Sequence, residues 1–294
     1  MPSVRDLRDR IRSLKNTQQI TKAMKQVAAA KIRRAEIAQR QARPYAQTLS
    51  EMLRDLMSAV THVEHPFMNP GKDGAPAGLV VMTADKGLAG AFNSNVVRAA
   101  ETYARTQGSV AYYTVGLKAR NAVRRLGFAD RPTWPLSAGS KIDTARAVAH
   151  RVTEDFESGT ISRVTLVSSR MISMMSQKPE TRELIPITPL DSGARSSAAS
   201  DDAQPMQGAV EFAPSPEFVL SRLLPKYLEF TLYSAMLETD AAFFAAQLVA
   251  MSNATDNASK LIDELTIAMN NARQAAITKE LLEIVAGAEA LGVE

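Results

Sequence analysis

The sequence predicts a fold of the α plus α/β class. In this fold the N- and C-terminal segments pair as a long antiparallel two-helix coiled coil, and an α/β domain is inserted between them. Three observations predict it: heptad spacing near the C-terminus, the same spacing at the N-terminus, and strand periodicity in between. We therefore divide the chain into a coiled-coil helix (1–58), an α/β foot domain (79–190), a mobile connection (191–215) and a second coiled-coil helix (216–294).

The N-terminal segment has the spacing of one coiled-coil helix. Its seam opens with apolar residues three and four positions apart: Val4, Leu7, Ile11 and Leu14. After a polar run at 16–19, we expect the seam to resume at Ile20, Met24 and Val27. Ser3 suits an N-cap, and Pro44 is expected to kink the helix without necessarily ending it.

The middle of the chain changes to alternating strands and helices. Strands are expected at 79–83, 110–115 and 164–168, with one more possible at 182–187. Helices are expected at 92–107, 117–126 and 144–156. This alternation predicts a mostly parallel, Rossmann-like α/β domain. The Ser-, Ala-, Gly- and Asp-rich stretch that follows predicts the mobile connection.

The C-terminal segment carries the longest seam. Apolar or small residues alternate at four and three positions: Leu237, Ala241, Phe244, Leu248, Met251, Thr255, Ala258, Ile262, Leu265, Met269, Ala272 and Ala276. A period of 3.5 residues favours a left-handed supercoil with a partner helix. If the two end helices pair antiparallel, the C-terminal helix is longer by ~20 residues, or roughly 30 Å, and its tip projects alone.

Composition limits the function. The 294 residues contain no cysteine, which excludes disulfide frameworks and thiolate metal sites. There is no uninterrupted apolar run of membrane-spanning length, so we expect no direct membrane insertion. Residues 1–43 carry a net charge of +9 and residues 216–294 a net charge of −6. This polarity fits either charge-matched pairing of the two helices or a partner-binding surface.

No residue pattern predicts catalysis. Gly87-Leu88-Ala89-Gly90 lies where a phosphate loop would sit, but it lacks a Walker lysine and a full dinucleotide fingerprint. His62, His65 and His150 are too scattered for a metal site. The basic N-terminal helix lacks interleaved aromatic residues, so nucleic-acid binding is disfavoured. We expect no cofactor, no metal and no nucleic acid.

The end of the C-terminal helix is the most suggestive segment. Arg273, Glu280 and Glu283 cluster on one side of a helix, while Gln274 and Thr278 face roughly the opposite side. Polar groups on both sides, with apolar residues between them, are typical of a helix that either protrudes unsupported or is encircled by other chains. Encirclement is the better explanation.

Three motifs carry a resemblance to a known family. They are Ile277-Thr278-Lys279-Glu280-Leu281-Leu282-Glu283 near the C-terminus, Asn16-Thr17-Gln18-Gln19-Ile20-Thr21-Lys22-Ala23-Met24 near the N-terminus, and Asp85-Lys86-Gly87-Leu88 in the middle. With these motifs in the order that the family has them along the chain, and nearly end to end, the chain resembles the gamma-subunit family of the F-type ATP synthases.

The resemblance implies a central rotor shaft that is itself non-catalytic and binds no nucleotide. Its partners would be the alpha and beta subunits of a catalytic head, the epsilon subunit and a membrane ring of c subunits. It would be a peripheral protein on the cytoplasmic face of a bacterial inner membrane. The runner-up is a coiled-coil scaffold or tether that does not rotate.

The resemblance also implies contact residues. Head contacts would come from Lys22, Met24, Gln247, Arg273, Gln274, Thr278, Glu280 and Glu283, and foot contacts from Lys86 and Phe212. The chain departs from the family pattern at several positions: Gln26, Ala89, Ala213, Phe243, Phe244, Gln247 and Met269. At Gln247 and Ala213 the departure removes a charge that the family pattern would place in a contact.

Overall fold

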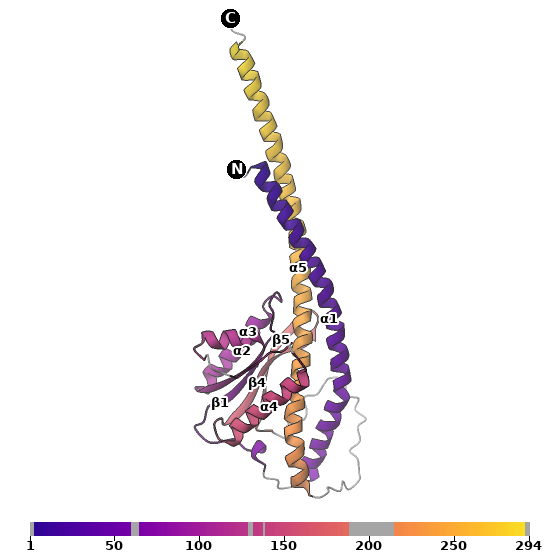
Figure 1. The fold of residues 1–294 in the computed structure, drawn as a ribbon, viewed down its shortest axis with the longest axis vertical. Helices are drawn as coiled ribbons and strands as arrows, with labels where there is room; N and C mark the ends of the chain where they lie inside the picture. The colour runs from indigo at the N-terminus through magenta and orange to yellow at the C-terminus, as the bar shows by residue number, and fades with distance from the viewer. Residues whose placement is uncertain (1–2, 60–64, 129–131, 138, 188–214, 292–294) are drawn as a thin grey trace. The chain divides into compact units, whose positions relative to one another are not determined.

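The computed structural model describes residues 3–59, 65–128, 132–137, 139–187 and 215–291. The chain forms two compact units (Figure 1). The first, here called the helix-pair unit, comprises Met1–Ala29 and Gln247–Glu294, and the second, the α/β unit, comprises Ala30–Ala246. Two helices run through both units, α1 (Val4–Ala59) and α5 (Pro216–Leu291). The predicted fold class is confirmed, whereas nearly all of the predicted connection at 191–215 lies outside the described residues.

Helix α1 begins at a reciprocal cap. The backbone N–H of Asp6 donates to Oγ of Ser3, and the backbone N–H of Ser3 donates to Oδ2 of Asp6, each at 3.2 Å. Two free amide groups of the first turn are thereby satisfied. Ser3 is confirmed as the N-cap, and α1 continues through Pro44 without a break, as expected.

The α/β unit contains a five-stranded sheet in the order β3-β2-β1-β4-β5. The strands are β1 (Ala77–Met82), β2 (Val110–Val115), β3 (Thr133–Trp134), β4 (Arg163–Ser173) and β5 (Ser176–Ile185). The first four are parallel, and β5 pairs antiparallel with β4. The connecting helices are α2 (Phe92–Gln107), α3 (Leu117–Arg125) and α4 (Lys141–Glu157), with a 3-10 turn, η1, at Pro66–Met68.

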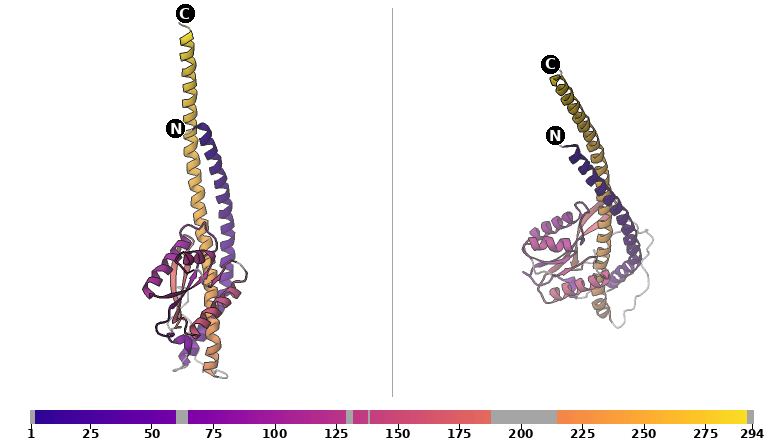
Figure 2. Two further views of the ribbon diagram at one scale, coloured as in Figure 1. Left: turned by 60° about the vertical axis from the view of Figure 1, so that its left-hand side comes forward. Right: turned by 45° about the horizontal axis from the view of Figure 1, so that its top comes forward.

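Helices cover both faces of this sheet (Figures 1 and 2). On one face, α2 and α3 pack on the sheet through Val96, Ala100, Ala119 and Val123. On the other face, α4 and the first part of α5 share a larger core with the sheet, to which α1 adds Leu49, Leu53 and Leu56. Since the middle strands are buried on both faces, β1 is an unbroken apolar run, as a covered parallel strand should be.

Three strands differ from the sequence-based expectation. Strand β4 was expected at 164–168 but continues to Ser173. Strand β3 was missed because two residues are too few to show any period. Strand β5 was expected only at 182–187, but it begins at Ser176. Only its last two residues, Leu184 and Ile185, are deeply buried, so the apolar signal marks the end of the strand and not its start.

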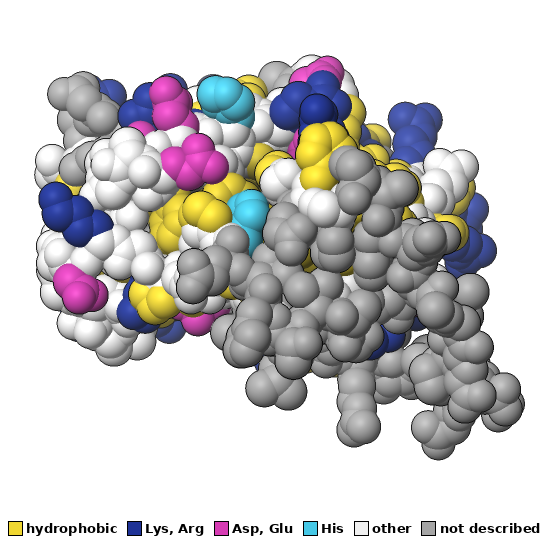
Figure 3. All heavy atoms as spheres, turned by 90° about the horizontal axis from the view of Figure 1, so that it is seen from below, with side chains coloured by type: hydrophobic (Ala, Val, Ile, Leu, Met, Phe, Trp, Pro, Cys, Tyr) yellow, Lys and Arg dark blue, Asp and Glu magenta, His cyan; other side chains and the backbone are white. Residues whose placement is uncertain are grey.

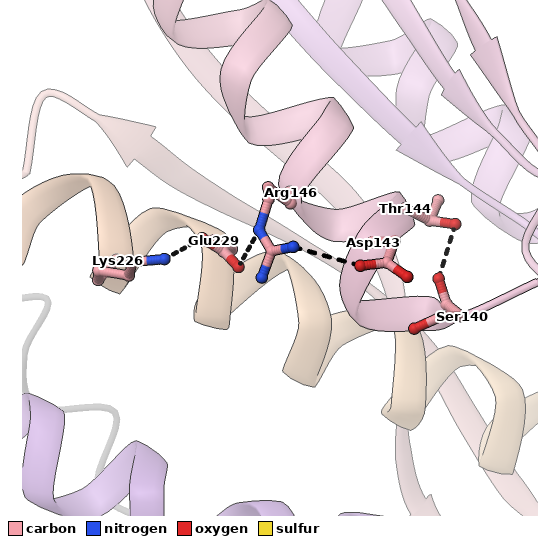
Figure 4. A network of polar contacts seen from close by, with 6 residues as sticks. All are labelled: Ser140, Asp143, Thr144, Arg146, Lys226 and Glu229. Carbon is pink, nitrogen blue, oxygen red and sulfur yellow. Dashed lines mark hydrogen bonds and ion pairs between the residues drawn. The ribbon is translucent and has the colours of Figure 1, made fainter.

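A buried carboxylate joins α4 to α5 within the α/β unit (Figure 4). Glu229 of α5, which is 8% exposed, accepts from Nε of Arg146 at 3.1 Å and from Nζ of Lys226 at 2.9 Å. Arg146 also donates from Nη1 to Asp143 at 3.2 Å. Two cations therefore compensate the charge of Glu229, which is the condition under which a buried carboxylate is tolerated.

Candidate functional site: the helix pair and the exposed end of α5

The seam of the helix-pair unit keeps a strict heptad through its polar stretch. Leu7, Ile11 and Ala28 of α1 are buried, as are Met251 and Ala258 of α5. The expected resumption at Ile20 and Val27 is wrong, because these side chains are 60% and 55% exposed. The heptad instead continues through the half-buried Gln18 and the buried Thr21 to Lys25, which is exposed at the edge of the seam. Apolarity therefore identified the wrong positions, since polar residues occupy the seam here.

Each of these polar seam residues has a polar partner on α5. Nε2 of Gln18 donates to Oγ of Ser259 at 2.6 Å, and Nζ of Lys25 donates to Oγ of Ser252 at 3.0 Å. Between them, Oγ1 of Thr255 and Oγ1 of Thr21 are hydrogen-bonded at 2.8 Å. We call these three pairs the polar ladder. It satisfies the polar groups of the seam in only one antiparallel register, so it contributes specificity of pairing.

The polar ladder leads to a prediction about paired substitutions. Thr21→Val alone should lower the free energy of unfolding by about 1 kcal/mol, because it leaves the half-buried Thr255 hydroxyl without its interhelical partner. Thr21→Val with Thr255→Val should recover most of that loss, since both polar groups are then removed. Urea unfolding of the four proteins of this double-mutant cycle measures the coupling. Additive effects would show that the two hydroxyls do not interact.

Charge-matched pairing of the two helices is not supported. Among the described residues of the helix-pair unit, no ion pair connects α1 to α5. Arg5, Arg8, Arg12, Lys15 and Lys22 are instead exposed along α1. Of the two interpretations of the charge polarity, this arrangement favours a partner-binding surface.

The end of α5 has no covering segment among the described residues. Every residue from Arg273 to Gly287 is exposed, over a length of about 20 Å. Five large apolar residues are included: Ile277, Leu281, Leu282, Ile284 and Val285. They lie within about 160° of the helix circumference, so they form a broad apolar stripe. We call the segment from Arg273 to Gly287 the α5 tip. Such a stripe is typical of a surface that binds another chain.

The eight expected head-contact residues all lie in the helix-pair unit. Arg273, Gln274, Glu280 and Glu283 are exposed on the α5 tip. Thr278 is exposed there too, and its hydroxyl donates to the backbone carbonyl of Gln274 at 3.0 Å. Lys22 is exposed on α1, while Met24 and Gln247 are half-buried. The structure thus brings five of these residues together on the tip and leaves them accessible to a partner.

Of the two expected foot contacts, Lys86 and Phe212, the structure describes only Lys86. Lys86 is exposed in the loop after β1, and its backbone carbonyl accepts from Nδ2 of Asn93 at 3.1 Å. Phe212 lies outside the described residues. Figure 3 shows basic, acidic and hydrophobic side chains interspersed over the described part of one face of the molecule.

Asp85, beside Lys86, ties three loops together. Its Oδ1 accepts from the backbone N–H groups of Leu117 and Leu136, at 2.9 and 3.2 Å. Its Oδ2 accepts from the backbone N–H of Ser137 at 2.8 Å and from the Ser137 hydroxyl. Burial raises the pKa of this carboxyl, but the four hydrogen bonds outweigh it, so the pKa lies below its usual value. The motif residue is therefore structural.

Removing the Asp85 carboxylate should be costly. We expect Asp85→Ala to destabilise the α/β unit by about 2–4 kcal/mol, because four donors, one of them on the buried Leu136, lose a charged acceptor. The lowered pKa has a second consequence. The stabilisation is present above the unfolded-state pKa of about 3.9 and is lost as the pH falls through the folded-state pKa. Urea unfolding at pH 7 and at pH 3 should therefore show a smaller difference between wild type and Asp85→Asn at the lower pH. An equal difference at both values would contradict this account.

The glycine-rich loop after β1 is anchored on an apolar cluster. Ala89 of this loop is 3% exposed and packs in a separate apolar cluster with Ala84, Phe92, Ala242 and Phe243. Apolar packing thus fixes one residue of the loop, and the expectation that no nucleotide binds there stays a prediction. His65 also has a structural role, because its Nδ1 accepts from the backbone N–H of Phe67 at 3.1 Å. His62 lies outside the described residues. Among the residues described, no three potential ligands gather into a metal site.

No described helix combines the length and apolarity needed to cross a membrane.

Sequence reasoning located the α5 tip through its residue pattern but missed the polar ladder. The strict 3.5-residue spacing of Gln18, Thr21 and Lys25, continued from Leu7 and Ile11, is the signal that could have found it.

Together, the paired helices and the inserted sheet define a class of protein in which an α/β domain is inserted between the two helices of an antiparallel coiled coil. The family model described as ATP synthase matches residues 3–291. The chain is 43% identical over 293 residues to an ATP synthase gamma chain of Heliobacterium modesticaldum, covering 99% of this chain and 100% of the relative. It is 42% identical over 299 residues to an ATP synthase gamma chain of Phenylobacterium zucineum, covering 99% and 100%. The chain therefore belongs to the ATP synthase gamma chain family.

Solved structures share the fold. A chain of the Euglena gracilis mitochondrial ATP synthase, in a structure of its OSCP, F1 and c-ring, superposes with a TM-score of 0.66 at 20% identity, covering 98% of this chain and 94% of that one. A chain of the central stalk and c-ring structure of the Tetrahymena thermophila mitochondrial ATP synthase gives a TM-score of 0.58 at 24% identity, covering 80% and 99%. At these sequence identities the structural similarity shows the fold alone.

Proposed function

We propose that this chain is the central-stalk rotor shaft of an F-type ATP synthase and that it is a non-catalytic subunit. The single observation that carries the proposal is the exposed α5 tip, because a helix with five large exposed apolar residues is not expected to remain uncovered in water. Membership of the gamma chain family supports the same function.

Encirclement by a ring of subunits is the arrangement that best suits the tip. Its apolar stripe occupies one side, Glu280 and Glu283 lie on the other side, and Arg273 lies at the edge of the stripe. A single partner groove would cover only one of these two sides. A sleeve formed by alpha and beta subunits contacts both, which also agrees with the exposure of Lys22 on α1.

The asymmetry of the helix pair would then couple its rotation to conformational changes of the beta subunits. Two helices of unequal reach present different side chains in each direction, so turning them inside a ring changes which beta subunit meets which surface. Proton flow through the c ring turns the shaft, and each beta site is driven through its conformations in turn. The chain's own contribution is shape, stiffness and charged contacts.

The remaining partners belong to the same proposal. The α/β unit is the foot, which sits beside the epsilon subunit on the ring of c subunits. The protein is then peripheral on the cytoplasmic face of a bacterial inner membrane, which agrees with the absence of a spanning helix among the described residues. The related structures named above contain a c-ring, and one is named as a central stalk.

Co-purification from native membranes tests the assignment. A tagged chain should bring down alpha, beta and epsilon subunits in fixed ratio, together with the c ring in mild detergent. The isolated chain should not hydrolyse ATP with Mg²⁺. Turnover that follows the pure chain through gel filtration, or recovery of the chain without the catalytic subunits, would refute the proposal.

A further inference from the structure

Four side chains of α5 contact four different elements within two helical turns. Glu238 faces Arg170 of β4 at 3.9 Å, and Asp240 pairs with Lys141 of α4 at 2.9 Å. The ring of Phe243 lies 5.7 Å from the ring of Phe92 of α2, and Nζ of Lys31 of α1 lies 5.0 Å from the centre of the Phe244 ring. We call this set of contacts the collar.

The collar holds α5 from several directions. At 100° per residue, Glu238, Phe243, Asp240 and Phe244 point in directions of roughly 0°, 140°, 200° and 240° around the helix axis. The contacts therefore come from several sides of the helix, and the widest sector between two neighbouring contacts is about 140°. Such an arrangement resists both sideways bending of α5 and rotation of α5 about its own axis.

Two contacts of the collar, the Phe243–Phe92 ring contact and the Asp240–Lys141 ion pair, are largely shielded from solvent. Phe243 is 4% exposed and Phe92 is 5% exposed. The rings of Phe243 and Phe244 are also 5.2 Å apart, which connects the α2 contact to the α1 contact. The side chains of Lys141 and Asp240 are only 24% and 15% exposed, so their ion pair is less screened than a surface pair.

The position along the chain gives the collar its significance. The α/β unit ends at Ala246 on α5 and begins at Ala30 on α1. Phe244 and Lys31 are therefore close in sequence to the points where the two helices leave the unit. Earlier in α5, Leu224, Leu228 and Leu232 are held in the core below the sheet. The collar thus lies within the last nine residues of α5 that belong to the α/β unit, from Glu238 to Ala246.

We propose that the collar is the junction at which turning force passes between the α/β unit and the helix pair, with Phe243 and Asp240 as its main positioning residues. This inference rests on the proposed function as a rotor shaft. A shaft that was loose at this point would twist before it turned, so the collar sets the torsional stiffness of the protein.

The test is a measurement of angular fluctuation in the reconstituted complex. Because the chain has no cysteine, a single Arg125→Cys substitution on α3 gives one labelling site for a bead. With the alpha/beta ring fixed to a surface and no ATP present, Phe243→Ala with Asp240→Asn should give a broader distribution of bead angles than wild type. With ATP, the same variant should lose part of its proton pumping per ATP hydrolysed.

Two controls keep this test sharp. Phe218→Ala removes an exposed aromatic ring of α5 that stacks on Arg222 and should leave the distribution of angles unchanged. Phe243→Leu keeps an apolar contact and should restore most of the stiffness lost in Phe243→Ala. Melting of each isolated variant shows whether it folds.

The outcomes separate the two proposals. If Phe243→Ala with Asp240→Asn folds and assembles but has the wild-type distribution of angles, the collar is ordinary packing and this inference is wrong. If Phe218→Ala broadens the distribution equally, the inference is also wrong. If the wild-type chain itself fails to assemble with the ring, the proposed function fails first.

Discussion

Replacing Gly116 with alanine is expected to destabilise the α/β unit by at least about 3 kcal/mol. Gly116 joins β2 to α3 at a φ of 94°, a backbone conformation that residues other than glycine rarely adopt. A Cβ atom there would also overlap the backbone carbonyl of Thr83, which cannot move because the backbone N–H of Thr83 donates to Val115 at 2.8 Å. Strain and overlap therefore add.

Gly127 provides the matched control. It has the same φ of 94°, but nothing lies within 4 Å of the position of its Cβ. Gly127→Ala should therefore cost only the conformational part, about 1 kcal/mol. Urea unfolding can be followed by the fluorescence of Trp134, the only tryptophan, whose carbonyl accepts from the backbone N–H of Gly116 at 2.8 Å. Equal losses at the two glycines would show that the close approach to Thr83 has no energetic weight.

Substitution of Glu280 and Glu283 by alanine should have a large effect in the assembled complex and almost none in the isolated chain. Both side chains are exposed on the α5 tip. Glu283 lies 3.6 Å from Lys279, but this surface ion pair contributes only about 0–1 kcal/mol. Inside a sleeve of partner subunits, breaking a hydrogen-bonded charge pair costs about 2–5 kcal/mol. Complex yield and ATP-driven proton pumping in vesicles should both fall.

The control for the tip uses the same chemistry in the other unit. Glu154→Ala with Glu157→Ala removes two exposed carboxylates from α4 and should leave assembly with the alpha/beta ring unchanged. Far-UV circular dichroism and melting of both isolated double variants should match wild type. Wild-type assembly and pumping by the tip variant would show that these carboxylates are solvated surface.

Long apolar repeats made most of this fold predictable. The seam of α5 was placed correctly at Met251 and Ala258, and the buried strand β1 was clear from its run of apolar residues. The polar seam positions of α1 have the same heptad spacing but were missed because Thr21 and Gln18 are not apolar, and the spacing does not identify their partners on α5. A hydrogen bond between residues more than two hundred positions apart leaves no local signal in the sequence.

The α5 tip shows both what pattern reasoning can do and where it stops. The residues that form the tip were found from their type and spacing. The role of Asp85 was not, since a carboxylate after a strand is equally consistent with ligand binding and with capping. Similarly, Phe243 departs from the family pattern, and only its contact with Phe92 explains why an aromatic ring fits there.

Rotation observed in single complexes tests the central claim most directly. The alpha/beta ring is fixed to a surface, and a probe is attached through Arg125→Cys on α3. A rotor shaft predicts stepwise turning of the probe in one direction when ATP is added, at a rate that follows ATP hydrolysis. A complex that hydrolyses ATP while the probe only fluctuates about one angle would contradict the account and identify the chain as a scaffold that does not rotate.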